Sequence, residues 1–143
     1  MSNINTEKMI WAQKVADDLK NSTDKYVVYK TSRPICDIKH MFTTSAELYA
    51  DNVAFMQKFA KDEPYTSITY REALETVNAL GTALIARGLK GKRIAVIGEN
   101  CYQWATSYLA VICGTGVVVP LDKELGANEL KQLCKEAEVS AVM

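Results

Sequence analysis

The side chains best suited to nucleophilic catalysis are sparse in this sequence. It has one histidine, His40, and four cysteines, Cys36, Cys101, Cys113 and Cys134. A Ser-His-Asp or Cys-His arrangement needs an imidazole beside the nucleophile, and His40 precedes the most regular part of the chain. No G-x-S-x-G turn is present to expose a nucleophilic serine. We therefore interpret His40 as an ordinary loop or partly packed residue and expect no catalytic residue in this chain.

Phosphate-binding loops are missing in their usual forms. Neither G-x-x-x-x-G-K-[ST] nor G-x-G-x-x-G occurs. The segment Gly114-Thr-Gly116 lies between a predicted helix and a predicted strand, whereas a phosphate loop needs the opposite order. The turn Gly98-Glu99-Asn100 has the right order, strand then helix, at the end of a strand where open α/β sheets bind ligands. Because Glu99 would repel a phosphate, we favour a structural cap at Asn100 over a nucleotide site.

The positions of the cysteines and of the histidine give little support to a metal site or to disulfide bonds. The cysteines form no C-x-x-C pair, and one histidine does not complete the closely grouped ligands of a zinc site. Four free thiols in a reducing compartment are the simplest interpretation. The N-terminus has no apolar stretch of signal-peptide type. We expect a cytoplasmic protein with no metal or cofactor held by these residues.

Charge patterning argues against a nucleic-acid partner. The 143 residues contain 17 Lys and Arg and 17 Asp and Glu, so the formal net charge is zero. A nucleic-acid binder normally needs a basic surplus. The basic stretch Arg87–Arg93 could attract a phosphorylated ligand or partner. Such residues more often complement the negative C-terminus of a helix, which is the interpretation we favour.

One uncharged run is long enough to cross a bilayer. No charge lies between Glu99 and Asp122, but Gly114, Gly116 and Pro120 interrupt this run. Its second half, Val117-Val-Val119, is β-branched. A helix, a turn and a strand account for the run better than a transmembrane segment.

The elements that position these residues are most regular after residue 65. Thr69-Tyr-Arg-Glu72 is a capping box, so a helix should begin there. Its apolar period continues to Arg87, and Gly88 suits the left-handed position beyond the helix. Asn100 and Gln103 form a second capping box for a helix to about residue 112.

The remaining apolar segments complete an alternating pattern. A continuous apolar run of buried-strand type occupies residues 94–97, and residues 117–121 predict the next buried strand. A further helix is expected over about 127–137, and residues 139–143 predict the start of another strand. The order β-α-β-α-β predicts an α/β fold, a parallel sheet with flanking helices.

The first 60 residues are less regular. An amphipathic helix is expected from Ile4 to Leu19, with Trp11 and Val15 on its apolar face. A strand is expected at Tyr26–Lys30. Thr44-Ser-Ala-Glu47 is a third capping box, preceding a short helix to about Tyr49. Residues 53–59 and 66–69 predict an antiparallel hairpin before the parallel sheet.

Together these segments resemble the N-terminal part of the adenylate-forming, AMP-binding superfamily. Ile68-Thr-Tyr-Arg-Glu72-Ala-Leu74 resembles the first core motif, although Ala73 separates the Glu and Leu that the family places side by side. The second core motif is similar to Ile112–Asp122, with its Gly, strand and Pro-Leu-Asp. The stretch Ile94–Asn100 followed by Trp104 is most like long-chain fatty acyl-CoA synthetases.

The resemblance implies a function for a longer protein. It implies ATP-dependent formation of an acyl-adenylate, then acyl-CoA with release of AMP and pyrophosphate, using ATP, Mg²⁺ and coenzyme A. The family's phosphate loop and catalytic lysine have no matching positions here, so the resemblance implies that these 143 residues alone are inactive. We expect this chain to contribute no catalytic, cofactor-binding or metal-binding residue.

The resemblance also suggests domain boundaries, and two alternative interpretations of the chain remain beside it. We expect residues 1–43 to form an extension packed on residues 44–143, the truncated AMP-binding domain. The apolar end Ala141-Val-Met143 suggests a strand cut from its neighbours, whose open edge could support a homodimer. The first alternative is a complete, non-enzymatic binding module with a flavodoxin-like sheet. The second is a small nucleotide-binding domain that uses the turn at Gly98.

Overall fold

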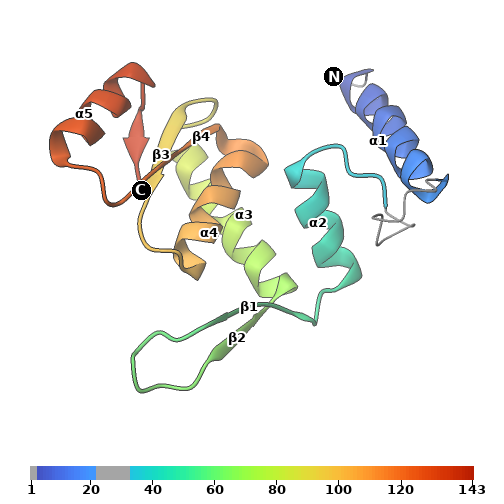
Figure 1. Ribbon diagram of the computed structural model, residues 1–143, viewed down its shortest axis with the longest axis horizontal. Helices are drawn as coiled ribbons and strands as arrows, with labels where there is room; N and C mark the ends of the chain where they lie inside the picture. Colours follow the sequence, from blue (N-terminus) through green and yellow to red (C-terminus); the bar gives the residue numbers. More distant parts are fainter. Residues whose placement is uncertain (1–2, 22–32) are drawn as a thin grey trace. The chain divides into compact units, whose positions relative to one another are not determined.

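The computed structural model describes residues 3–21 and 33–143. Its internal contacts divide the chain into two units, Met1–Met41 and Phe42–Met143. Figure 1 colours the helices and strands by their order along the chain. No helix in the described part of the chain is long and apolar enough to cross a membrane.

The first unit contains α1, Asn3–Asn21, which confirms the N-terminal helix predicted from sequence. Among the side chains of α1 that the structure describes, Ala12 and Ala16 are buried, whereas Trp11 is 63% exposed. The apolar face expected at Trp11 and Val15 is therefore not the buried one. The strand expected at residues 26–30 lies outside the described residues.

The helix α2, Ile38–Leu48, begins earlier than predicted. The backbone N–H of His40 donates to Asp37 Oδ1 at 2.7 Å, so Asp37 caps its first turn. The predicted capping box at Thr44–Glu47 is wrong, because those residues lie inside the helix. His40 also lies in this helix and not in a loop, but it is half-buried, which confirms the partly packed alternative. A helix that has already been nucleated continues through a Ser/Thr-x-x-Glu sequence without restarting.

An antiparallel hairpin follows α2, as predicted. It consists of β1, Val53–Gln57, and β2, Thr66–Thr69. Phe55 pairs with Ile68 and Met56 with Ser67. Since successive side chains alternate between faces, Ile68 is buried in the core while Met56 is 62% exposed. The helix α3, Tyr70–Ala86, follows directly.

The rest of the second unit confirms the predicted β-α-β-α-β order. Its elements are β3, Arg93–Ile97; α4, Tyr102–Ala110; the π-helical turn η1, Val111–Thr115; β4, Val117–Leu121; α5, Ala127–Glu136; and β5, Ala141–Val142. The sheet order is β4-β3-β5, and both pairs are parallel. The α3 and α4 helices pack together, while α5 lies apart from that pair (Figure 1).

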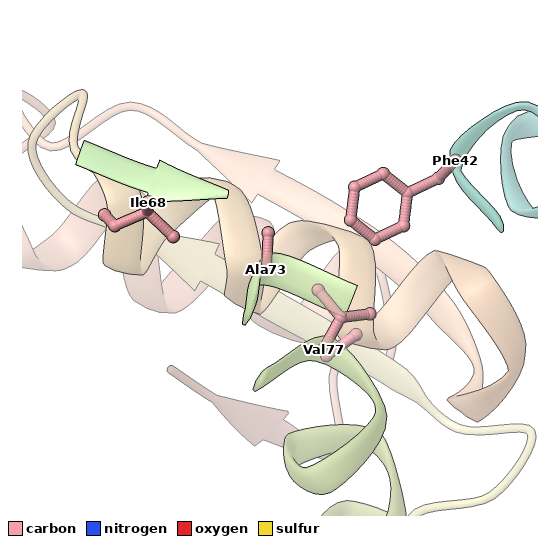
Figure 2. Close-up of a cluster of buried hydrophobic side chains, with 5 residues drawn as sticks. Phe42, Ile68, Ala73 and Val77 are labelled. Carbon is pink, nitrogen blue, oxygen red and sulfur yellow. The ribbon is translucent and has the colours of Figure 1, made fainter. Parts of the chain in front are cut away.

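The core of the second unit consists of two apolar clusters. One contains Phe42, Ile68, Ala73, Val77 and Ala110, and joins α2, the hairpin, α3 and α4 (Figure 2). The other contains Leu84, Ile94, Val96 and Val111 beneath the parallel sheet. These clusters hold the hairpin and the sheet on opposite ends of the same helix, α3.

Burial differs between the strands of the parallel sheet. Ile94, Ala95 and Val96 in β3 are at most 1% exposed. In β4, Val117 is 54% exposed and no residue is buried. The prediction that residues 117–121 form a buried strand is therefore wrong, since β4 has one neighbouring strand among the described residues and β3 has two.

Candidate functional site

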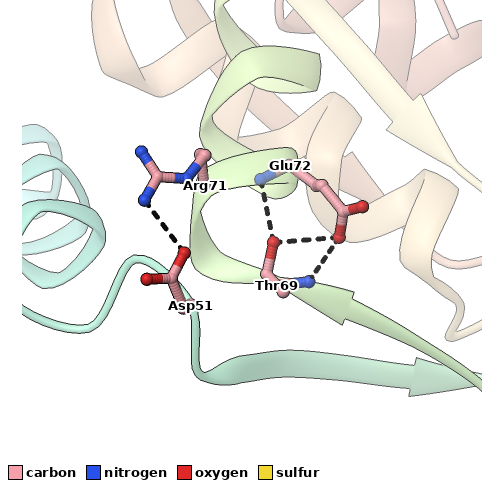
Figure 3. Close-up of polar contacts among 4 residues, drawn as sticks. All are labelled: Asp51, Thr69, Arg71 and Glu72. Atoms are coloured by element: carbon pink, nitrogen blue, oxygen red, sulfur yellow. Dashed lines mark hydrogen bonds and ion pairs between the residues drawn. The ribbon is translucent and has the colours of Figure 1, made fainter.

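The first sequence motif forms a complete capping box where β2 meets α3 (Figure 3). The N–H of Glu72 donates to Thr69 Oγ1 at 3.2 Å, and the N–H of Thr69 donates to Glu72 Oε2 at 2.8 Å. The Thr69 backbone and hydroxyl hydrogen bonds hold the pKa of Glu72 below its ordinary value. The neighbouring Arg71 pairs with Asp51 at 2.9 Å, which raises the pKa of the guanidinium. These contacts fix the hairpin to the helix.

The second motif controls how closely η1 approaches the strand β3. Thr115 is buried, and its hydroxyl donates to the carbonyl of Ala110 at 2.8 Å. A Cβ on Gly116 would lie 2.1 Å from the carbonyl oxygen of Lys92, so only glycine fits there. The N–H of Val117 donates to that same oxygen at 2.9 Å. The motif thus sets the start of the β3–β4 register.

The turn after β3 lies beside the residues that follow β4. Lys123 Nζ contacts Glu124 Oε1 and Glu99 Oε1, each at 2.7 Å. The hydrogen bond with Glu124, and then that with Glu99, raises the pKa of Lys123. The ammonium is thereby engaged by two carboxylates, an arrangement that leaves this edge of the sheet unsuited to an anionic phosphate.

A residue from the hairpin caps α4. The N-cap position is Cys101, which makes no side-chain capping bond, so the predicted Asn100–Gln103 capping box is wrong. The Oε1 of Gln57 instead accepts from the N–H of Tyr102. Its Nε2 donates to Gln103 Oε1 at 3.0 Å. No local pattern predicts this cap, because Gln57 lies 45 positions before Tyr102 in the chain.

A groove of about 580 Å³ lies between the hairpin and the first turn of α4. Its lining combines aromatic, aliphatic and polar side chains: Phe55, Met56, Gln57, Lys58, Tyr65, Asn100, Cys101, Tyr102, Trp104 and Ala105. The Phe55 and Tyr102 rings meet edge to face with centroids 5.3 Å apart. Sequence reasoning did not identify this groove, since its walls are distant in the chain.

The basic stretch is largely structural, as we favoured from sequence. Arg87 Nη1 donates to the Ala83 carbonyl in the last turn of α3 at 3.3 Å. Arg93 Nη1 donates to the carbonyl of Ala137, the C-cap of α5, at 3.3 Å, and also pairs with Glu138. Both guanidiniums therefore satisfy carbonyls at helix C-termini, where the helix dipole favours positive charge.

The candidate metal ligands do not converge. Cys36, Cys101, Cys113 and Cys134 form no disulfide, and each is partly buried. The backbone N–H of Cys36 donates to His40 Nδ1 at 3.3 Å, which gives that imidazole a local structural contact. Within residues 3–21 and 33–143, no three His, Cys, Asp or Glu side chains are placed to hold a metal ion.

Comparison with known proteins gives these motifs a family. The profile of the family described as AMP-binding enzyme matches residues 42–143. The chain belongs to the AMP-binding enzyme family. Long chain acyl-CoA synthetase 1 of Arabidopsis thaliana is 34% identical over 106 residues, which are 71% of this chain and 16% of that protein. Fatty acyl-CoA synthetase A of Dictyostelium discoideum is 31% identical over 128 residues, which are 87% of this chain and 18% of that protein.

The likeness in fold extends to solved structures. The N-terminal subdomain of NpsA from Klebsiella oxytoca superposes with a TM-score of 0.64 at 22% identity, covering 74% of this chain and 26% of that chain. This supports the fold. The chain spans about a sixth to a fifth of the length of the two curated relatives. In the present chain, the two core motifs position the hairpin, α3 and the parallel sheet relative to one another.

Proposed function

We propose that this chain is the N-terminal portion of an AMP-forming acyl-CoA synthetase of the long-chain fatty acid type. The match of residues 42–143 to the AMP-binding enzyme family carries the proposal. The similarity to plant and Dictyostelium acyl-CoA synthetases supports this reaction and this substrate class. The longer protein would act in the cytoplasm and join a fatty acid to coenzyme A through an acyl-adenylate, using ATP and Mg²⁺.

The role of these 143 residues in that reaction would be scaffolding. The capping box Thr69–Glu72 and the close backbone approach at Gly116 both fix backbone segments, which is a structural role. Adenylate formation depends on positioning and on stabilising the charge of the phosphates. Lys123 is paired with two carboxylates and is a poor candidate for that charge stabilisation.

Pyrophosphate release with palmitate, ATP and Mg²⁺ tests both parts of this proposal. We expect no release above the protein-free blank from the 143-residue chain. We expect release, and palmitoyl-CoA when coenzyme A is added, from the longest open reading frame that contains this sequence. Robust turnover by the 143-residue chain would contradict the scaffold role. Inactivity of the longer protein towards fatty acids of all lengths would contradict the acyl-CoA synthetase proposal.

The oligomeric state and ATP binding distinguish this proposal from the two alternatives, a complete binding module and a small nucleotide-binding domain. We infer self-association through β5, because it is an edge strand in the order β4-β3-β5 of the described residues. Light scattering at increasing concentration should then show a dimer, whereas a complete binding module would stay monomeric. Tight calorimetric binding of ATP that is lost in a Gly98→Val variant would favour the small nucleotide-binding domain.

A further inference from the structure

The groove between the hairpin and α4 combines a ring-lined wall with a single sign of charge. Phe55, Tyr65 and Trp104 contribute aromatic surface, and the volume of about 580 Å³ is in the usual range for small-ligand sites. None of the lining residues is an aspartate or a glutamate. All of them belong to the second unit. Such a wall favours a flat apolar group, because aromatic rings pack well in offset or edge-to-face arrangements.

Lys58 supplies the charge. It is the one lysine or arginine among the lining residues, and its Nζ lies 5.2 Å from the centroid of the Tyr65 ring. Among the described residues no carboxylate forms an ion pair with Lys58. A lysine held over a ring, without an acidic partner, can still pair with an anion from solution.

The first N–H of α4 is already engaged by the hairpin. The N–H of Tyr102 donates to Gln57 Oε1, and the side-chain amide of Gln57 is itself held by Gln103. This N–H is therefore not available to a ligand in the groove. The selectivity for charge rests on Lys58, and the selectivity for shape rests on the three rings.

We propose that this groove binds a small aromatic carboxylate, with the carboxylate paired to Lys58 and the ring packed against Phe55, Tyr65 and Trp104. The site goes beyond acyl-CoA synthesis, since it requires neither ATP nor coenzyme A. It involves no covalent step. A neutral ligand of the same shape keeps the ring contacts and loses the ion pair.

Trp104 provides the reporter for a direct test in the 143-residue chain. The protein has two tryptophans, and Trp11→Phe leaves Trp104 as the only one. In this background, 3-phenylpropionate should change the tryptophan emission saturably without ATP or coenzyme A. We expect 3-phenylpropionamide to bind about fivefold more weakly, the factor for one partly exposed ion pair. Equal affinity for the acid and the amide, or no saturable change, would overturn the proposal.

Matched variants test whether Lys58 is the residue that pairs with the carboxylate. We expect Lys58→Gln to weaken 3-phenylpropionate about fivefold and Lys58→Arg to restore most of the affinity. Lys61→Gln, an exposed lysine outside the groove lining, should leave the affinity unchanged. Equal weakening by Lys58→Gln and Lys61→Gln would overturn the assignment. A saturable signal from Trp11 in a Trp104→Phe variant would place binding elsewhere and also overturn it. These titrations are independent of the pyrophosphate assay, so either proposal can fail alone.

Discussion

At the scale of single residues, Gly116 leaves the least room for change. A Cβ at this position would lie 2.1 Å from the Lys92 carbonyl oxygen, so the backbone must shift to admit one. We expect Gly116→Ala to lower the free energy of unfolding by about 3 kcal/mol. Gly88→Ala is the matched control. Gly88 has a φ of +78° but no atom within 4 Å of an added Cβ, so its cost should be about 1 kcal/mol. Urea unfolding midpoints measure both, and a smaller effect at Gly116 would contradict the close backbone approach.

Glu72 makes one part of the stability depend on pH. Its pKa is held below the ordinary value of 4.5 by the Thr69 N–H and hydroxyl. The contribution is therefore complete above pH 4.5 and is lost as the pH falls through the lower folded pKa. Glu72→Gln keeps an acceptor for the Thr69 N–H but does not ionise in this range.

The expected result is a stability difference between wild type and Glu72→Gln that is largest at pH 7 and narrows towards pH 3. Urea unfolding at both pH values measures it. Glu75→Gln on the same helix, which makes no capping bond in the described structure, should give a smaller narrowing. A difference that stays constant from pH 7 to pH 3 would rule out the ionised capping box.

At the scale of elements, one side chain joins the hairpin to α4. Gln57 accepts from Tyr102 N–H and donates to the Gln103 side chain. We expect Gln57→Ala to speed hydrogen exchange in the first turn of α4 and to cost about 1 kcal/mol of unfolding free energy. Gln103→Ala removes only the outer bond and should leave that turn protected. Similar exchange in both variants would show that Gln57 is not the cap.

Elements whose signals are local were predictable. The Thr69–Glu72 box and the apolar run at 94–97 give α3 and β3 at nearly the observed bounds. The start of α4 was not predictable, because Gln57 caps it from another element. The error at Thr44–Glu47 is of a different kind. Asp37, directly before the first helical residue, carries the usual N-cap signal, and an earlier cap takes precedence over a later one in the same apolar pattern.

At the scale of the whole molecule, the site was less predictable than the fold. The β-α-β-α-β order follows from alternating local patterns, and the family match begins at the residue where the second unit begins, Phe42. The groove draws residues 55–58 and 65 together with residues 100–102, 104 and 105. That convergence requires the register Phe55–Ile68 and the packing of the hairpin on α3, neither of which a linear pattern specifies.

The location of the core predicts how far the chain can be shortened. Every residue of both apolar clusters lies between Phe42 and Met143. The α2 helix that supplies Phe42 begins at Ile38 and is capped by Asp37. Residues 37–143 should therefore unfold cooperatively in urea, with a midpoint close to that of the whole chain. Residues 42–143 lack the cap and the first turn of α2, so they should be less stable by about 1 kcal/mol. Asp37→Ala in the full chain isolates the cap and should reproduce much of that loss. A shortened chain 37–143 without a cooperative transition would mean that residues 1–36 are needed to stabilise the second unit.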